Sequence, residues 1–212
     1  MQKFFVRLIR LSAALCATTS LLACNTTTMS QTNNLNNGQP SGPSPIDDRI
    51  NGQIADFDAM VHRLENGGFP LDSDVPDTGH VTYTGFGAIY IDGHPDDGYL
   101  IGDAEVRADF VSYAFEGEVT DMAGTVNGQA SVAWNGTLEL SGEVGLTHTA
   151  GLEGTVNGSL SAGSDHLSIH GPISGFFQGS PVTGLSIRTA DGVTTILNGE
   201  NVSGSVAVIA EH

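Results

Sequence analysis

Residues 100–110 of the chain read LIGDAEVRADF, and this stretch decides the class of fold. Every even-numbered residue in it is apolar or glycine, whereas Asp103, Glu105, Arg107 and Asp109 occupy the alternate positions. A period of two places successive side chains on opposite faces of a β-strand. The stretch therefore predicts a half-buried strand, with one face toward a core and the other toward water.

The same alternation returns at residues 138–144 and again at residues 167–177. Many strands of this kind with no helices between them are typical of a closed antiparallel barrel or a sandwich. Residues 79–210 give room for eight strands of about ten residues with their turns. We therefore expect an all-β domain, a small eight-stranded antiparallel up-and-down β-barrel. Charges fill the outer face, so we expect water outside and an apolar interior rather than a barrel that faces lipid.

The pentapeptide Gly-Thr-Val-Asn-Gly occurs twice, at residues 124–128 and 154–158. Asn-Gly is a strong signal for a type I′ hairpin turn. Alternation nevertheless continues through both copies, and we predict that both lie inside strands. There the glycines would let a tightly curved sheet bend and would leave room for bulky residues opposite.

Three segments, residues 78–86, 102–110 and 171–179, resemble the β-barrel domain of transferrin-binding protein B and its short relatives. The resemblance consists of glycines, aromatic residues and alternation, and it covers most of residues 78–210. It implies a lipid-anchored bacterial surface protein with an eight-stranded barrel. The chain is too short for the two-lobed transferrin binder and departs from the longer proteins at residues 180–182. The resemblance therefore implies the fold, and it does not imply transferrin.

A helical period precedes the barrel. Apolar residues recur there at steps of three and four: Ile50, Ile54, Phe57, Val61 and Leu64. Residues 66–68, Asn-Gly-Gly, are a stop signal, and Gly52 weakens the first turn, so we predict a helix over residues 54–66. Its apolar stripe should pack on the domain that follows. This divides the chain into a short helix with a connecting loop, residues 46–77, and a β-barrel domain, residues 78–212.

The N-terminus carries the marks of an export signal. Residues 1–23 begin with basic residues, continue with an apolar stretch too short to span a membrane, and end in Leu-Leu-Ala before Cys24. A cysteine in this place resembles the bacterial lipobox, in which the thiol receives a diacylglycerol and cleavage leaves that cysteine as the first residue. We predict a lipoprotein signal peptide over residues 1–23 and lipidation of Cys24. An ordinary signal peptide with an incidental cysteine is the alternative.

The residues around Cys24 refine this prediction. Cys16 would leave with the signal, so Cys24 has no partner for a disulfide within the mature chain. Asn25 follows it, and by resemblance to Gram-negative lipoproteins the absence of aspartate there favours the outer membrane. Residues 24–45 are mostly small and polar with few apolar groups, which predicts a flexible tether. We expect a protein anchored by lipid to the outer membrane, facing the cell surface.

Charge excludes one class of partner. The chain has 7 Lys and Arg against 24 Asp and Glu. Removal of the signal takes away Lys3, Arg7 and Arg10, which leaves four arginines against 24 acidic residues and a net charge of −20. Such a surface repels nucleic acid. A basic partner or loosely held divalent cations are compatible with it.

The most polar loop, residues 92–98, supplies the candidate binding residues Asp92, His94, Asp96 and Asp97. Its spacing is close to that of a calcium loop, but the glutamate that closes such a loop is missing. We therefore interpret it as a solvated hairpin connection, and we predict no metal and no cofactor.

No catalytic set emerges from the remaining motifs. Residues 77–79, Asp-Thr-Gly, have the letters of an aspartic-protease site but occur once, so we expect a loop before the first strand. His166 and His170 would lie about 13 Å apart along a strand, too far for one metal ion. Residues 164–166, Ser-Asp-His, read as a turn rather than a catalytic triad.

Two classes of function follow, and an enzyme comes third. The first is a non-enzymatic surface lipoprotein whose barrel binds a macromolecule through its loops. The second is a carrier of a small apolar ligand or haem within the barrel. The interior distinguishes them, because no ligand pocket exists if large side chains fill it: Phe110, Trp134, Leu140, Leu152 and Phe177.

Overall fold

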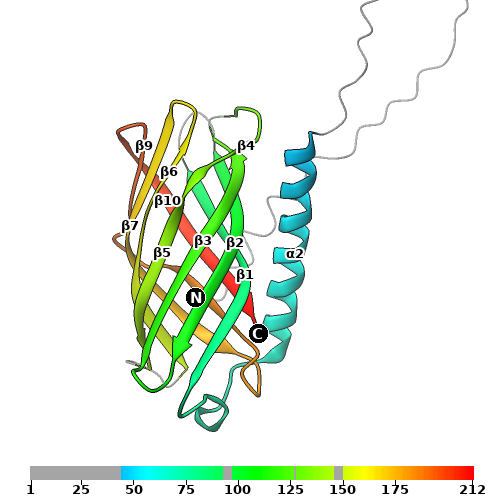
Figure 1. The fold of residues 1–212 in the computed structure, drawn as a ribbon, viewed down its shortest axis with the longest axis vertical. Coiled ribbons are helices and arrows are strands. Elements are labelled where there is room, and N and C mark those ends of the chain that lie inside the picture. The colour runs from blue at the N-terminus through cyan, green and yellow to red at the C-terminus, as the bar shows by residue number, and fades with distance from the viewer. Residues whose placement is uncertain (1–43, 93–96, 127, 146–149) are drawn as a thin grey trace, which may run out of the picture. The chain divides into compact units, whose positions relative to one another are not determined.

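The computed structural model describes residues 44–92, 97–126, 128–145 and 150–212. This part of the chain is a long helix, a single-turn 3-10 helix and a sheet of ten strands (Figure 1). The elements are α2 Pro45–Gly67, η1 Asp72–Asp74, β1 His80–Asp92, β2 Gly98–Asp109, β3 Ala114–Thr125, β4 Val132–Ala133, β5 Asn135–Val144, β6 Gly151–Ala162, β7 Asp165–Gln178, β8 Gly184–Thr189, β9 Thr194–Leu197 and β10 Glu200–Glu211.

The sheet closes into an antiparallel barrel. Strands that follow one another in the sequence pair in the order β1-β2-β3-β5-β6-β7-β8-β10, and β10 returns to pair with β1. The short strand β4 adds only to β3. β8 and β9 share one position, because both pair with β7 and with β10 at different heights. Eight positions result, and the predicted eight-stranded up-and-down barrel is confirmed.

Alternation sends one set of side chains inward on every long strand. In β2 the even-numbered residues from Gly102 to Ala108 are buried, while Asp103, Glu105 and Arg107 are exposed, as the sequence predicted. The inward residues form one continuous apolar cluster. Its centre includes the ring of Phe177, which lies 5.8 Å from the ring of Tyr83 and 5.5 Å from that of Phe110.

A β-bulge reverses the inward set within β3. The pairing with β2 shifts between Ile101 and Asp103, and Asp121 opposite them has φ 50°. Before the shift the odd-numbered Val119 points inward, whereas after it Met122 belongs to the interior cluster. Ala123 is thereby turned outward, where it joins Ile101 beneath the helix.

The two copies of the pentapeptide adopt different structures. The second copy, residues 154–158, lies inside β6 as predicted, and Gly158 pairs with both Leu138 and Ile169. The prediction for the first copy holds for Gly124, which lies in β3, and is wrong for Gly128. β3 ends at Thr125, Gly128 has φ 62°, and the Gln129 amide donates to the Val126 carbonyl at 3.2 Å, so the chain turns there. The error arises because β2 begins at Gly98 and its last pair with β3 is Tyr99 with Thr125, so the rest of this copy runs past its partner strand.

The inward glycines make room for large neighbours, as predicted. A Cβ built on Gly142 would lie 2.7 Å from Phe115 Cε1, and one on Gly87 would lie 2.5 Å from Val119 Cγ2. Both distances are far inside van der Waals contact. The narrow interior is therefore filled by large side chains that pack directly over the glycine backbone of a neighbouring strand.

Helix α2 is longer than the predicted 54–66. It starts at Pro45 with a capping box, in which the Asp47 amide donates to Ser44 Oγ at 3.3 Å and the Ser44 amide donates to Asp47 Oδ2 at 3.2 Å. Pro at the first helical position favours the same start. Gly52 is exposed within the helix and does not end it. Residues 44 and 45, predicted as the end of the tether, thus belong to the helix and its cap.

The apolar stripe of α2 packs on the outside of the barrel, as expected (Figure 1). Ile50 shares a buried cluster with Ile101 and Ala123, and Leu64 lies over Gly184, where an added Cβ would meet Leu64 Cδ2 at 2.6 Å. Arg63 then joins the last strand through an ion pair with Glu211 at 2.8 Å. None of the described helices combines the length and apolar character needed to cross a membrane.

Candidate functional site

The barrel interior is occupied by side chains. Phe110, Trp134, Leu140, Leu152 and Phe177, the five residues predicted to decide between a filled and an open interior, are all buried and belong to the same cluster. Three inward polar groups lack a hydrogen-bond partner among the described atoms: Tyr83 Oη, Trp134 Nε1 and Thr195 Oγ1. Burial raises the pKa of the Tyr83 hydroxyl. Single ordered waters are the usual partners of such groups.

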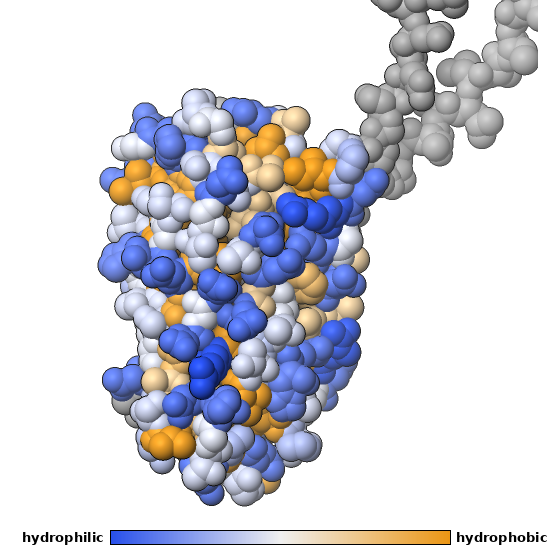
Figure 2. Space-filling view, viewed as in Figure 1, coloured by the Kyte–Doolittle hydropathy of each residue, from blue (hydrophilic) through white to orange (hydrophobic). Residues whose placement is uncertain are grey.

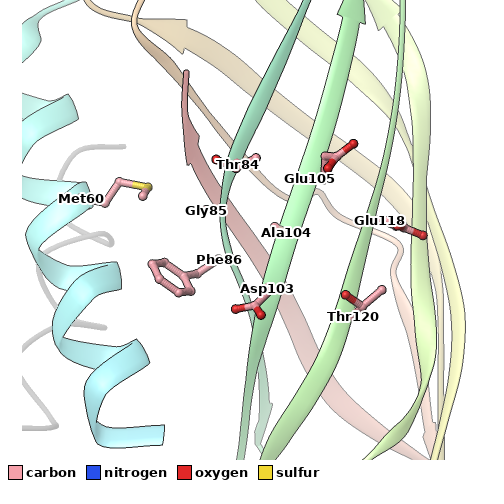
Figure 3. A pocket seen from close by; sticks show the side chains of 9 residues that line it. All are labelled: Met60, Thr84, Gly85, Phe86, Asp103, Ala104, Glu105, Glu118 and Thr120. Carbon is pink, nitrogen blue, oxygen red and sulfur yellow. The ribbon is translucent and has the colours of Figure 1, made fainter. Parts of the chain in front are cut away.

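A groove lies on the outer surface, between α2 and the first three strands (Figure 3). Its volume is about 460 Å³, and it is open to solvent. The lining residues come from four elements: Met60 of α2; Thr84, Gly85 and Phe86 of β1; Asp103, Ala104 and Glu105 of β2; Glu118 and Thr120 of β3. We call this the helix–sheet groove.

The helix–sheet groove has one apolar side and one acidic side. Met60 projects from α2 toward the barrel, and Phe86 projects from β1 toward α2 (Figure 3). Asp103 is the register partner of Phe86 and lies beside it, and the carboxylates of Glu105 and Glu118 follow on the same face of the sheet, farther from α2. Asp103 Oδ1 accepts a hydrogen bond of 2.9 Å from Gln53 Nε2, which ties this carboxylate to the helix.

The acidic side continues across the sheet as a row of directly opposed glutamates. Glu105 of β2 is the register partner of Glu118 of β3, and Glu118 is the partner of Glu139 of β5. All three are exposed. Like charges directly opposite one another destabilise a sheet. We call Glu105, Glu118 and Glu139 the glutamate row.

The candidate loop at residues 92–98 joins β1 to β2 as a hairpin connection, which confirms that part of the prediction. Asp92 ends β1, and Asp97, which precedes β2, accepts a hydrogen bond of 3.2 Å from Tyr90 Oη. Both carboxylates are exposed. His94 and Asp96 lie outside the described residues. Within the described ranges, no three Asp, Glu, His or Cys side chains gather as metal ligands would.

The other motifs lie apart from one another. Asp77 is exposed in the loop before β1, as predicted. His166 and His170 are exposed on β7, and Ser164 lies in the turn that precedes that strand. Asn198 Oδ1 accepts a hydrogen bond of 2.8 Å from the His166 amide, and Asn198 Nδ2 donates to Asp165 Oδ1 at 2.8 Å. This segment therefore fixes two neighbouring hairpins, which is a structural role.

The face in Figure 2 is mostly hydrophilic or neutral, with apolar side chains gathered near the end of the barrel where α2 begins. Two large apolar side chains are exposed near the other end of α2. Phe69 is 77% exposed, Phe176 is 39% exposed, and their rings meet edge to face at 6.4 Å. This contact fixes the loop after the helix against β7.

Sequence reasoning missed the helix–sheet groove. It placed Asp103 and Glu105 on the outer face of a strand and Glu139 on another, but it had no means to find which strands pair or where α2 lies. Finding the acidic side of the groove would have required the strand order, because Glu105, Glu118 and Glu139 become neighbours only through the register of β2, β3 and β5.

No known protein family, curated protein or solved structure matches the chain. The resemblance to the transferrin-binding protein B barrel therefore stays an expectation from the residues that carry it.

Proposed function

We propose that this protein is a lipid-anchored lipoprotein of the bacterial outer membrane, exposed at the cell surface, whose barrel is a rigid, non-enzymatic binding module. The observation that carries the proposal is the filled interior. Five large side chains meet in one buried cluster, three of them from β5, β6 and β7 and two, Phe110 and Trp134, from positions directly after β2 and directly before β5, so binding falls to the outer surface. A rigid scaffold that presents loops and grooves is a common basis for recognition.

The anchor in this proposal is Cys24, which lies outside the described residues. Support for it comes from the sequence alone: a basic start, a short apolar stretch and Leu-Leu-Ala directly before the cysteine. The eight-stranded barrel is the fold that the resemblance to short relatives of transferrin-binding protein B implies. We include membership of that family in the proposal, and we leave transferrin out of it.

The filled interior weighs against the second candidate, a carrier of an apolar ligand or haem. A site for a small molecule needs several hundred cubic ångströms of largely apolar space. The groove of about 460 Å³ is outside the barrel and has three carboxylates on its wall, which suits neither ligand.

Metabolic labelling with radioactive palmitate tests the anchor. The wild-type chain should incorporate label and Cys24→Ala should not. Cys16→Ala is the matched control and should keep the label, because Cys16 lies within the predicted signal peptide. Equal labelling of the wild type and Cys24→Ala would refute the lipoprotein proposal. Digestion of intact cells by added protease, with rupture of the outer membrane as control, tests whether the barrel faces outward.

A further inference from the structure

We propose that the helix–sheet groove docks a basic segment of a partner protein, one in which an arginine or lysine stands beside an apolar side chain. This inference rests on the proposed binding function and adds the site and the chemistry of the partner to it. Three observations carry it: the two-sided chemistry of the groove, the unrelieved repulsion of its glutamates, and an arginine of the chain itself that already binds at the same level of the sheet.

The two sides of the groove match the two parts of a long basic side chain. Met60 and Phe86 offer an apolar surface close to α2, and Glu105 and Glu118 lie beside it on the next strands of the sheet (Figure 3). Arginine and lysine place their aliphatic stems on apolar surface while the charged head reaches a polar partner. An apolar neighbour in the same segment would add contact with Met60 and Phe86. A volume of about 460 Å³ is large enough for a few side chains.

No described cation makes an ion pair with the glutamate row, although Arg107 lies on the same outer face, two residues from Glu105. Glu105 and Glu118 face each other directly, and neither makes a hydrogen bond or an ion pair with any described residue. The described ranges hold four arginines and no lysine: Arg49, Arg63, Arg107 and Arg188. A bound guanidinium between the two carboxylates would relieve their repulsion, so partner binding and strand pairing favour one another.

The chain supplies its own example of such a contact. Thr84 of β1 pairs on one side with Glu105 and on the other side with Glu211 of β10, so Glu211 stands in line with the glutamate row. Arg63 of α2 binds Glu211 through two nitrogens, with Nη2 at 2.8 Å from Oε2 and Nε at 3.1 Å from Oε1. Glu105 and Glu118, which continue the same row beyond Thr84, offer carboxylates in the same way to an arginine of a partner protein.

A free metal ion fits this surface less well than a protein segment does. The described residues bring together no three side chains with the spacing of metal ligands, and a hydrated ion gains nothing from Met60 and Phe86. Nucleic acid would be repelled by the carboxylates. The apolar wall and the charges together favour a peptide chain.

A binding titration tests the inference, with the full chain in mild detergent and a short capped peptide that alternates leucine and arginine. Binding should weaken as salt is added. Because each exposed ion pair contributes modestly to binding, Glu105→Gln/Glu118→Gln should weaken binding about fivefold. The control Glu143→Gln/Glu200→Gln removes the same charge outside the groove and should change affinity less than about twofold. Peptides with citrulline for arginine, or serine for leucine, should bind more weakly than the parent.

Equal losses in the two double variants would overturn the inference, because they would mean diffuse attraction to an acidic protein. The inference would also be overturned if the wild type did not bind the peptide, or if it bound the citrulline peptide equally well. Displacement of the peptide by calcium chloride at matched ionic strength would overturn it too. The thermal midpoint of Glu105→Gln/Glu118→Gln should be no lower than that of the wild type, which separates lost binding from lost folding. Palmitate labelling does not depend on any of these peptide-binding measurements. A failure of the docking inference can therefore be told apart from a failure of the proposed lipid anchor.

Discussion

Inside the barrel, single glycines decide how closely two strands can approach. Gly142 is the clearest case, since a Cβ there would contact the Glu153 carbonyl oxygen, and would lie 2.6 Å from the Gly154 Cα and 2.7 Å from Phe115 Cε1. Two of these three atoms are backbone, which cannot move aside without disturbing the ladder. The size of one side chain is therefore coupled to the pairing of β5 with β6.

Gly142→Ala should lower the free energy of unfolding by about 1–3 kcal/mol, the usual cost of overpacking a close-packed core. Chemical denaturation followed by circular dichroism measures it. A variant as stable as the wild type would mean that the strands can separate at this point, contrary to the packing described.

Tyr99 provides a second test at the scale of one residue. It packs beside α2, and burial raises the pKa of its hydroxyl from 10.0 to about 12, with a smaller contribution from the charge of Asp58. The folded state therefore favours the neutral form. The associated stability is fully present below pH 10 and is lost as pH rises toward about 12.

The spectrophotometric titration of the wild type minus that of Tyr99→Phe should show one tyrosine with a midpoint about 12. A difference curve centred near 10.0, the ordinary pKa of tyrosine, would mean that α2 does not cover Tyr99 in solution.

The glycine pattern also shows how much of the structure could be predicted from the sequence. The alternation of glycine with apolar residues correctly predicted which faces turn inward, because it follows from the two-residue repeat of a strand. The first Gly-Thr-Val-Asn-Gly was misread because its partner strand β2 begins at Gly98 and pairs only as far as Thr125, whereas the second copy has partner strands on both sides. Nothing local to the pentapeptide distinguishes the two copies, so the outcome depends on the partner strand.

At the scale of elements, α2 is held to the barrel by contacts separate from the barrel core. Ile50 belongs to a small cluster with Ile101 and Ala123, whereas the inward residues form their own cluster. Near its C-terminal end the helix is fixed by Leu64 over Gly184 and by Arg63 bound to Glu211. We therefore expect that the helix can detach while the barrel stays folded.

Leu64→Ala should cost about 2–5 kcal/mol of helix docking, since Leu64 is 2% exposed. Hydrogen exchange should then accelerate in α2 and remain slow in β5, β6 and β7. Equal acceleration in the helix and in these strands would indicate that helix and barrel unfold as one unit.

Gly52→Ala should have the opposite effect on the same helix, a gain of stability. An added Cβ at Gly52 meets nothing within 4 Å, so alanine should stabilise α2 by about 0.5–1 kcal/mol through its helix propensity. Slower exchange of the α2 amides would register the gain. Unchanged exchange would mean that the start of the helix is not formed in solution, as the sequence prediction of residues 54–66 implied.

At the scale of the whole molecule, closure gives every described strand except β4 a partner on both sides and packs large side chains into one narrow interior. Composition and alternation predicted this architecture, including the strand number. They could not predict the helix–sheet groove, because it depends on the seat of α2 and on the register that brings Glu105, Glu118 and Glu139 together.

Phe177→Ala tests whether the interior is as full as described. Phe177 is 0% exposed, so the change should cost about 3–5 kcal/mol and leave an apolar cavity. The variant should then bind benzene, as engineered apolar cavities do, while the wild type should not. Benzene binding by the wild type with similar affinity would revive the carrier alternative.

The placement of α2 also has a mechanical consequence. The chain enters at Pro45, follows the outside of the barrel and reaches β1 only after the helix has ended. A force applied to the N-terminal end of α2 would first separate the helix from the outside of the barrel, one contact after another. β1 would resist longer, since it is bonded along its length to both β2 and β10 and would have to shear. Unwinding α2 would change its rise from about 1.5 to about 3.4 Å per residue. The segment that precedes β1 would then become about 40 Å longer before any force reached the barrel.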